Sequence, residues 1–167
     1  AAVAGPRVEP KLLHELTAAE STSIDECLAT GVLCVEEGAF VFRHELARQA
    51  TLDRLSPQAQ KALHARILAA MSAGSPDGAA LSLSRLAHHA AGAGDRDKVL
   101  EFAPRAAAEA AKLGAHQQAA AHLANALKHA DGALPALAAQ LHESWAYEAG
   151  VALRIDESIL AARHKAI

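Results

Sequence analysis

The feature that most constrains this chain is a series of alanine- and leucine-rich segments of helical length, separated by short glycine-containing breaks. Alanine has the highest helix propensity, and glycine adopts the backbone conformations in which helices end. Breaks are expected at 92–95 (GAGD), 113–115 (LGA), 130–132 (ADG) and 153–154 (LR). The pattern predicts helices over 80–91, 96–111, 115–130, 134–152 and 154 to the end.

The breaks also repeat in sequence, because residues 94–99 align with 114–119 and with 153–158. Around 114–127 the repeat resembles the tetratricopeptide pattern, in which glycine ends one helix and small residues let the next helix pack against it. The match is weaker at the third copy, where Leu153 replaces the glycine. Since such repeats bury their faces only by stacking on neighbours, we expect a tetratricopeptide-like array over 80–167, truncated at its C-terminus.

The N-terminal half has a different pattern, in which short helices flank one β-hairpin. The segments 32–35 (VLCV) and 39–42 (AFVF) alternate in strand fashion around the turn EEG. We expect helices from Pro10 to Leu16, from Ser21 or Ser23 to Gly31, from His44 to Leu55 and from Ser56-Pro57 onward. Glycine, proline and polar residues in 72–79 (SAGSPDGA) mark the boundary between a first domain, 1–73, and the helical array.

Composition excludes several classes of protein. Hydrophobic residues make up 51% of the 167 residues and aromatic residues only 3%, which favours closely stacked helices. The net charge of −3 provides no basic field for nucleic acid, and no apolar run has the length of a membrane span. The N-terminus lacks the features of a signal peptide, and Cys27 and Cys34 are expected to be reduced, so we expect a cytoplasmic protein. A first residue that is alanine and a helical pattern that continues to Ile167 suggest an excised segment.

The stretch GAFVFRHELARQATLDRL (38–55) changes its period halfway, from strand-like alternation to helical spacing. Together with the preceding GVLCVEE (31–37), with LSPQAQKALHARI (55–67) and with the later RLAHHAAGAGDRDKVLEFAPRAAAEAAKLGAHQQAAAHLANAL (85–127), it resembles the middle of LuxR-type large ATP-binding regulators. These belong to the STAND class of signal-transduction ATPases, and the resemblance covers essentially the whole chain. Members of that family carry a P-loop ATPase domain, a winged helix, tetratricopeptide-like helices and often a DNA-binding helix-turn-helix. The resemblance therefore implies a mainly α fold with a winged-helix-like module at 1–73.

The chain departs from the family because it contains no GxxxxGK phosphate-binding loop and no terminal helix-turn-helix. We therefore expect no catalytic residues and no cofactor in this segment, whereas ADP or ATP is expected in the intact parent. The expected partners are the neighbouring ATPase domain and a protein or small effector on the helical repeats. The resulting hypothesis is a non-catalytic regulatory and sensing segment. The alternatives are a free-standing helical scaffold without a nucleotide link and, third, an enzyme.

The FRHEL sequence is similar to a motif in which a histidine at the start of a winged-helix helix, followed by an acid, contacts the β-phosphate of ADP. The resemblance assigns this nucleotide-sensing role to His44 and Glu45, and Arg43 and Arg48 add positive charge nearby. A helix N-terminus favours a phosphate, and imidazole changes its protonation near neutral pH. The alternative is a structural role, with His44 capping or packing and Glu45 and Arg48 forming a solvated pair.

Two other kinds of binding are not expected. Residues 21–38 carry four acidic residues and no basic residue, so the helix and turn that a DNA-binding winged helix would use repel phosphates. The ten histidines lack HExxH and the i,i+4 pairing of helical zinc sites, so we expect scattered surface histidines and no metal site. The histidines considered for that site were His88, His89, His116, His122 and His129.

Trp145 and Tyr147 lie in HESWAYEAG, on a helix that would face the next repeat. Inter-helix packing is one interpretation of these aromatics. The other is that they line a concave groove for a peptide or a small inducer. The open last helix also predicts that the chain self-associates.

Overall fold

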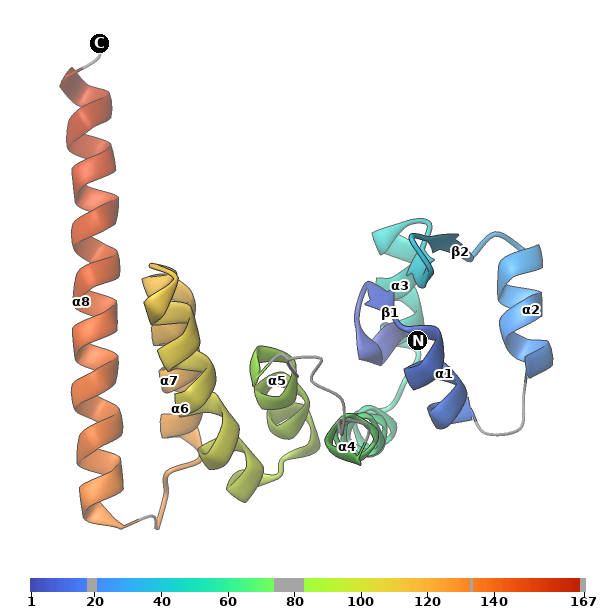
Figure 1. The fold of residues 1–167 in the computed structure, drawn as a ribbon, viewed down its shortest axis with the longest axis horizontal. Helices are drawn as coiled ribbons and strands as arrows, with labels where there is room; N and C mark the ends of the chain where they lie inside the picture. Colours follow the sequence, from blue (N-terminus) through green and yellow to red (C-terminus); the bar gives the residue numbers. More distant parts are fainter. Residues whose placement is uncertain (18–20, 74–82, 133, 166–167) are drawn as a thin grey trace. The chain divides into compact units, whose positions relative to one another are not determined.

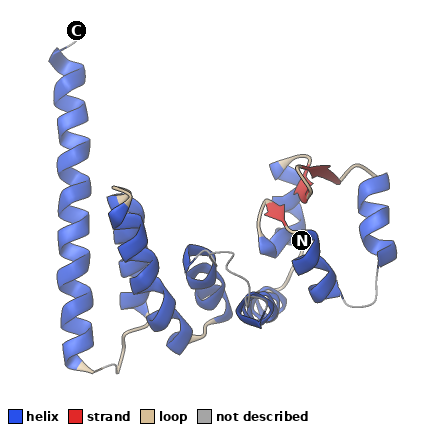
Figure 2. Ribbon diagram, viewed as in Figure 1, coloured by secondary structure: helices blue, strands red, loops and turns tan. Residues whose placement is uncertain are grey.

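The computed structural model describes residues 1–17, 21–73, 83–132 and 134–165, and these residues are mainly α-helical (Figures 1 and 2). They include eight α-helices, one short 3-10 helix and three β-strands. The chain divides into two compact units. The first comprises Ala1–Leu81 with Gly92–Gly94, and the second comprises Ser82–Ala91 with Asp95–Ile167. Residues 74–79 of the expected boundary lie outside the described residues.

The first unit combines short helices with a small antiparallel sheet. Its elements are η1 (Ala2–Ala4), β1 (Arg7–Val8), α1 (Pro10–Thr17), α2 (Ser21–Ala29), β2 (Leu33–Glu36), β3 (Ala39–Phe42), α3 (Glu45–Asp53) and α4 (Pro57–Ala73). The predicted hairpin is confirmed, with Leu33 opposite Phe42 and Glu36 opposite Ala39. Its turn residues Glu37 and Gly38 both have positive φ, as the tight turns that suit a twisted hairpin require.

The sheet has a third strand that the sequence patterns do not indicate. β1 pairs with β3 through Arg7–Val41 and Val8–Phe40, so the strand order is β1-β3-β2. A strand of two residues is too short to show alternation, and only its position against β3 defines it. The apolar core of this unit lies where η1 and α1 pack against α4, with Val8 and Ile67 almost completely buried.

The second unit contains only helices among its described residues. It consists of α5 (Leu83–Ala93, whose last two residues group with the first unit), α6 (Arg96–Lys112), α7 (His116–Lys128) and α8 (Pro135–Lys165). α6 packs on α7 and α7 packs on α8. The contact surfaces are mostly alanine, and Ala103, Ala119 and Ala126 are fully buried. Small side chains at these positions allow the helix axes to approach closely.

Three of the four expected helix breaks are confirmed, and the fourth is wrong. Gly94, Gly114 and Gly132 follow α5, α6 and α7 with φ between 65° and 74°, the left-handed conformation that glycine adopts without strain. No break occurs at Leu153 and Arg154. Both residues lie inside α8, which runs without interruption from Pro135 to Lys165. Leucine and arginine are good helix formers and do not favour positive φ, so the weakest copy of the repeat lacks the residue that ends a helix.

Within the described ranges, none of the helices combines the length and apolar character that crossing a bilayer demands.

Candidate functional sites

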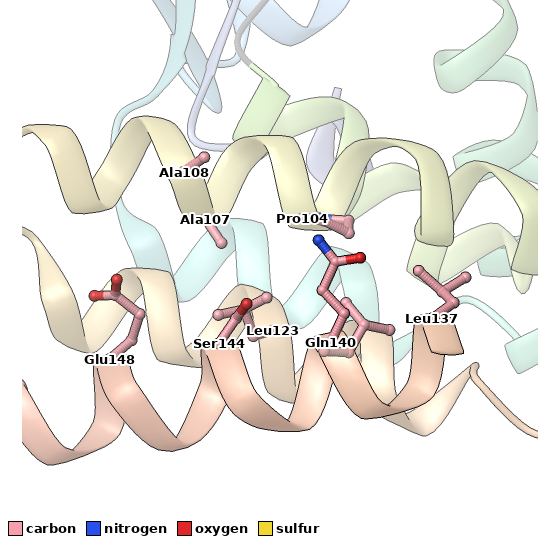
Figure 3. A pocket seen from close by; sticks show the side chains of 9 residues that line it. Pro104, Ala107, Ala108, Leu123, Leu137, Gln140, Ser144 and Glu148 are labelled. Carbon is pink, nitrogen blue, oxygen red and sulfur yellow. The ribbon is translucent and has the colours of Figure 1, made fainter. Parts of the chain in front are cut away.

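The second unit contains a groove between α6 and α8, with α7 beneath it (Figure 3). Its volume is about 320 Å³. The apolar lining comes from Pro104, Ala107 and Ala108 of α6, Leu123 of α7, and Leu137 and Leu141 of α8. The polar lining comes from α8 alone and consists of Gln140, Ser144 and Glu148, which follow one another at intervals of four residues.

Glu148 lies at one end of the groove and contacts the preceding helix, α7. Its Oε2 atom lies 2.7 Å from Nδ1 of His116, the first residue of α7. The two side chains are 12% and 22% exposed, so both are largely withdrawn from solvent. A carboxylate near the start of a helix also interacts favourably with the helix dipole. Glu148 therefore combines a structural contact with a position that faces the groove.

Trp145 and Tyr147, for which a groove was one of two interpretations, are not among the residues that line this groove. Trp145 is 40% exposed and Tyr147 is 64% exposed, and both belong to the same helix as the lining residues. The sequence analysis did not identify Gln140, Ser144 and Glu148. Their i, i+4, i+8 spacing could have indicated them, because it places three polar groups along one face of a helix.

The histidines of the second unit differ in their surroundings. His89 is only 1% exposed, so the expectation that the histidines lie at the surface is wrong for this residue, which shares the buried face of α5 with Leu86 and Ala90. Its ring contacts that of the exposed His88 edge-on, with ring centroids 5.1 Å apart. His122 Nε2 lies 2.8 Å from the Ser84 hydroxyl, and burial lowers the pKa of His122 below its ordinary value.

In the first unit, the junction between β3 and α3 carries the four predicted nucleotide-sensing residues. β3 ends at Phe42 and α3 begins at Glu45, so the predicted change from strand to helix is confirmed. His44 is the N-cap residue, with extended backbone angles of −135° and 130°. Its side chain makes no capping hydrogen bond and is exposed. The capping role considered for the His44 imidazole is therefore not seen.

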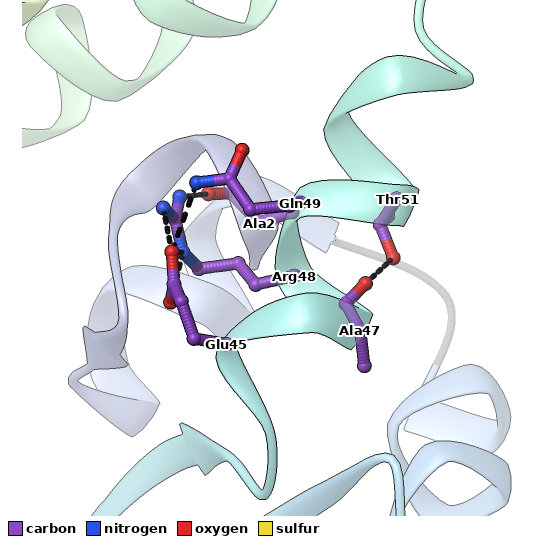
Figure 4. Close-up of polar contacts among 6 residues, drawn as sticks. All are labelled: Ala2, Glu45, Ala47, Arg48, Gln49 and Thr51. Carbon is purple, nitrogen blue, oxygen red and sulfur yellow. Dashed lines mark hydrogen bonds and ion pairs between the residues drawn. The ribbon is translucent and has the colours of Figure 1, made fainter.

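Glu45 and Arg48 form one cluster with the N-terminal 3-10 helix (Figure 4). Arg48 Nε donates to both carboxylate oxygens of Glu45, at 3.0 and 2.8 Å, and Gln49 Nε2 donates to Glu45 at 2.9 Å. The Arg48 guanidinium also donates to the backbone carbonyl of Ala2 at 3.2 Å. Because the Arg48 side chain is only 16% exposed, this cluster is more than a solvated surface pair. It fastens the start of α3 to η1.

The hydrogen bonds from Arg48 and Gln49 lower the pKa of Glu45 to about 2, and the bond to Glu45 raises the pKa of Arg48. Both groups are thus charged over the physiological range. Arg43 does not join them. Its guanidinium lies beside Gly31 instead, about 3.7 Å from the position that a Cβ on that glycine would occupy. The structure therefore brings together two of the four predicted residues, and leaves His44 and Arg43 outside the cluster.

The acidic surface of residues 21–38 carries one contact that the sequence does not indicate. Arg7 of β1 lies 3.1 Å from the Glu37 carboxylate in the hairpin turn, so a base from a distant part of the chain pairs with one of the four acids. Asp25, Glu26 and Glu36 are also exposed. Cys27 and Cys34 are free thiols, half-buried, as predicted.

Comparison with family models, curated proteins and solved structures finds no match to this chain.

Proposed function

We propose that this chain is the regulatory and sensing segment of a LuxR-type ATP-binding regulator of the STAND class, and that it has no catalytic activity of its own. In this role it relays between a P-loop ATPase domain and an output domain through packed surfaces. The proposal starts from the residue resemblance at 31–67 and 85–127. The observation that carries it is the junction at which an exposed histidine precedes a helix whose first turn is fastened by neighbouring residues.

The topology of the first unit supports a winged-helix arrangement. Two helices, α1 and α2, separate β1 from the β2–β3 hairpin, and the strand order is β1-β3-β2. In this arrangement the hairpin is the wing, and α3 follows it directly. The acidic residues on α2 and on the hairpin turn oppose DNA binding, so this module is better suited to docking against protein. The antiparallel helices of the second unit supply the tetratricopeptide-like part of the proposal.

The geometry of the junction suggests different roles for the four residues. The His44 side chain is exposed and makes no hydrogen bond with the described residues, so its imidazole is available to donate to a nucleotide phosphate. Arg43, also exposed, adds positive charge beside it. Glu45 and Arg48 already satisfy each other, so we assign them to positioning the first turn of α3. In the parent, bound ADP or ATP would determine the regulatory state, and this chain would contribute His44 as the side chain that contacts the nucleotide.

The test is the rate at which a fluorescent ADP analogue dissociates from the parent protein. Loss of a charge-assisted hydrogen bond corresponds to roughly 10- to 100-fold faster release in the His44→Ala variant. The matched control is His142→Ala, which removes an exposed histidine from α8 in the other unit. Because the His44 side chain makes no capping bond, its removal should leave the fold intact. Release at the wild-type rate from His44→Ala would contradict the proposed role.

The groove in the second unit favours a second candidate, a free-standing helical scaffold with no nucleotide link. Solenoid-like helical arrays present such concave surfaces to partners. The two candidates differ in what the parent binds: the regulator binds ADP or ATP, and the scaffold binds neither. Equilibrium dialysis of the parent against ADP separates them.

A further inference from the structure

We infer that the groove between α6 and α8 binds a small molecule with an apolar body and a positively charged amine. This inference deepens the proposed function, because it names the chemical class of the effector. It rests on the proposed function only for the role of the ligand as that effector.

The size of the groove indicates a small molecule. The lining of α8 runs from Leu137 to Glu148, a distance of about 16 Å at 1.5 Å per residue. The groove holds about 320 Å³, which is at the lower end of the range for small-molecule sites.

The α6 wall is apolar, whereas the α8 wall carries the polar groups together with Leu137 and Leu141. Pro104, Ala107 and Ala108 form an apolar wall on α6, and Leu123 forms the floor. On the opposite wall, Gln140 and Ser144 offer hydrogen-bonding groups one helical turn apart, as Figure 3 shows. A ligand with an apolar body can contact the α6 wall and the floor while it hydrogen-bonds along α8. Its position along the groove is then set by Glu148.

The charge of the groove selects the head group. Glu148 is the one charged residue among those that line it, and no lysine or arginine is among them. Its Oε2 atom contacts His116, whereas Oε1 makes no hydrogen bond with the described residues. A carboxylate whose side chain is 12% exposed is poorly hydrated, so a cation that reaches Oε1 gains more than it would at an open surface. An anionic ligand would be repelled at the same place.

The experiment is an NMR titration of the isolated chain with three ligands that share one apolar body. These are 4-phenylbutylammonium, 4-phenylbutyrate and 4-phenylbutanol. We expect the ammonium compound to bind at least tenfold more tightly than the carboxylate and to shift amide signals of α6 and α8 that flank the groove. Equal affinities for the three compounds, or shifts confined to another surface, would overturn the inference. The inference would also be overturned if the chain bound an extended peptide such as Ala-Leu-Ala-Leu-Lys but none of the three compounds.

Variants assign the binding to particular residues. Glu148→Gln should weaken binding of the ammonium compound about tenfold and leave that of the alcohol unchanged. Glu143→Gln, which removes an exposed carboxylate from the same helix outside the groove, is the matched control and should change neither. Ala108→Phe fills the groove from an exposed helical position and should weaken all binding, so it tests the site even if Glu148→Gln does not fold. Ammonium binding that survives both Glu148→Gln and Ala108→Phe would refute the site. None of these measurements involves nucleotide, so their failure is distinguishable from failure of the His44 test.

Discussion

Replacing either of two glycines of the second unit by alanine should change its stability in opposite directions. Gly114 lies between α6 and α7 with φ of 74°, whereas Gly150 lies inside α8. Among the described residues, a Cβ added at either position meets no neighbouring atom within 4 Å, so neither substitution creates a steric clash with them. The difference between them therefore reports the backbone conformation alone.

The magnitude follows from two terms. An L-residue in the left-handed conformation costs about 1–2 kcal/mol, and alanine restricts the unfolded chain by about 0.4–1 kcal/mol, which offsets part of that cost. Gly114→Ala should thus lower the free energy of unfolding by about 1 kcal/mol. Gly150→Ala places alanine in a helix interior, where it is favoured over glycine by about 0.5–1 kcal/mol, and should raise that free energy.

The assay is urea denaturation of the chain followed by circular dichroism at 222 nm. Both glycines belong to the second unit, so both variants shift the same unfolding transition. Unchanged slopes with midpoints displaced in opposite directions are the expected result. A stabilising Gly114→Ala would refute the left-handed turn between α6 and α7. A destabilising Gly150→Ala would refute the continuous helix α8 and restore a break near Leu153.

Three further predictions concern pH and association. Because the folded state lowers the pKa of Glu45 from 4.5 to about 2, the Glu45–Arg48 contact stabilises the first unit fully above pH 4.5 and is lost as the pH falls toward 2; urea titrations should show this loss in the wild type and not in Glu45→Gln. Burial lowers the pKa of His122, so the unfolded state binds the proton at a higher pH than the folded state, and stability should fall as the pH drops below 6.5. The melting temperature should therefore decrease with falling pH, and it should decrease less steeply in His122→Gln. Sedimentation velocity should show self-association that increases with concentration and is reduced by Leu153→Glu, since Leu153 is 64% exposed on α8; a single monomer peak at high concentration would contradict it.

Local patterns predicted the parts of the fold in which one residue type dictates the backbone. Gly94, Gly114 and Gly132 end helices because other residues resist a positive φ, and the hairpin is predicted by alternation around EEG. The break at Leu153 was predicted from a repeat copy that lacked this glycine, and it is wrong for that reason. β1 was missed because two residues carry no period, and its existence depends on β3, more than thirty residues away.

The candidate sites show the same division between local and distant information. The strand-to-helix change before Glu45 could be predicted from periodicity, and so could the Glu45–Arg48 pair. The contact of Arg48 with the Ala2 carbonyl could not, because it joins residues 46 positions apart. The groove between α6 and α8 could not be predicted either, since only the packing of α6, α7 and α8 determines which face of α8 lines it.

The central claim is that this chain belongs to a larger protein in which it serves a nucleotide-binding domain. The most direct measurement is the mass and sequence of the natural protein that contains these 167 residues, obtained from the complete reading frame and from mass spectrometry of the protein isolated from its source. We predict a polypeptide several times larger than 17.3 kDa, with a GxxxxGK phosphate-binding loop on the N-terminal side of Ala1. A mature protein of about this mass, or a longer one without such a loop, would contradict the account.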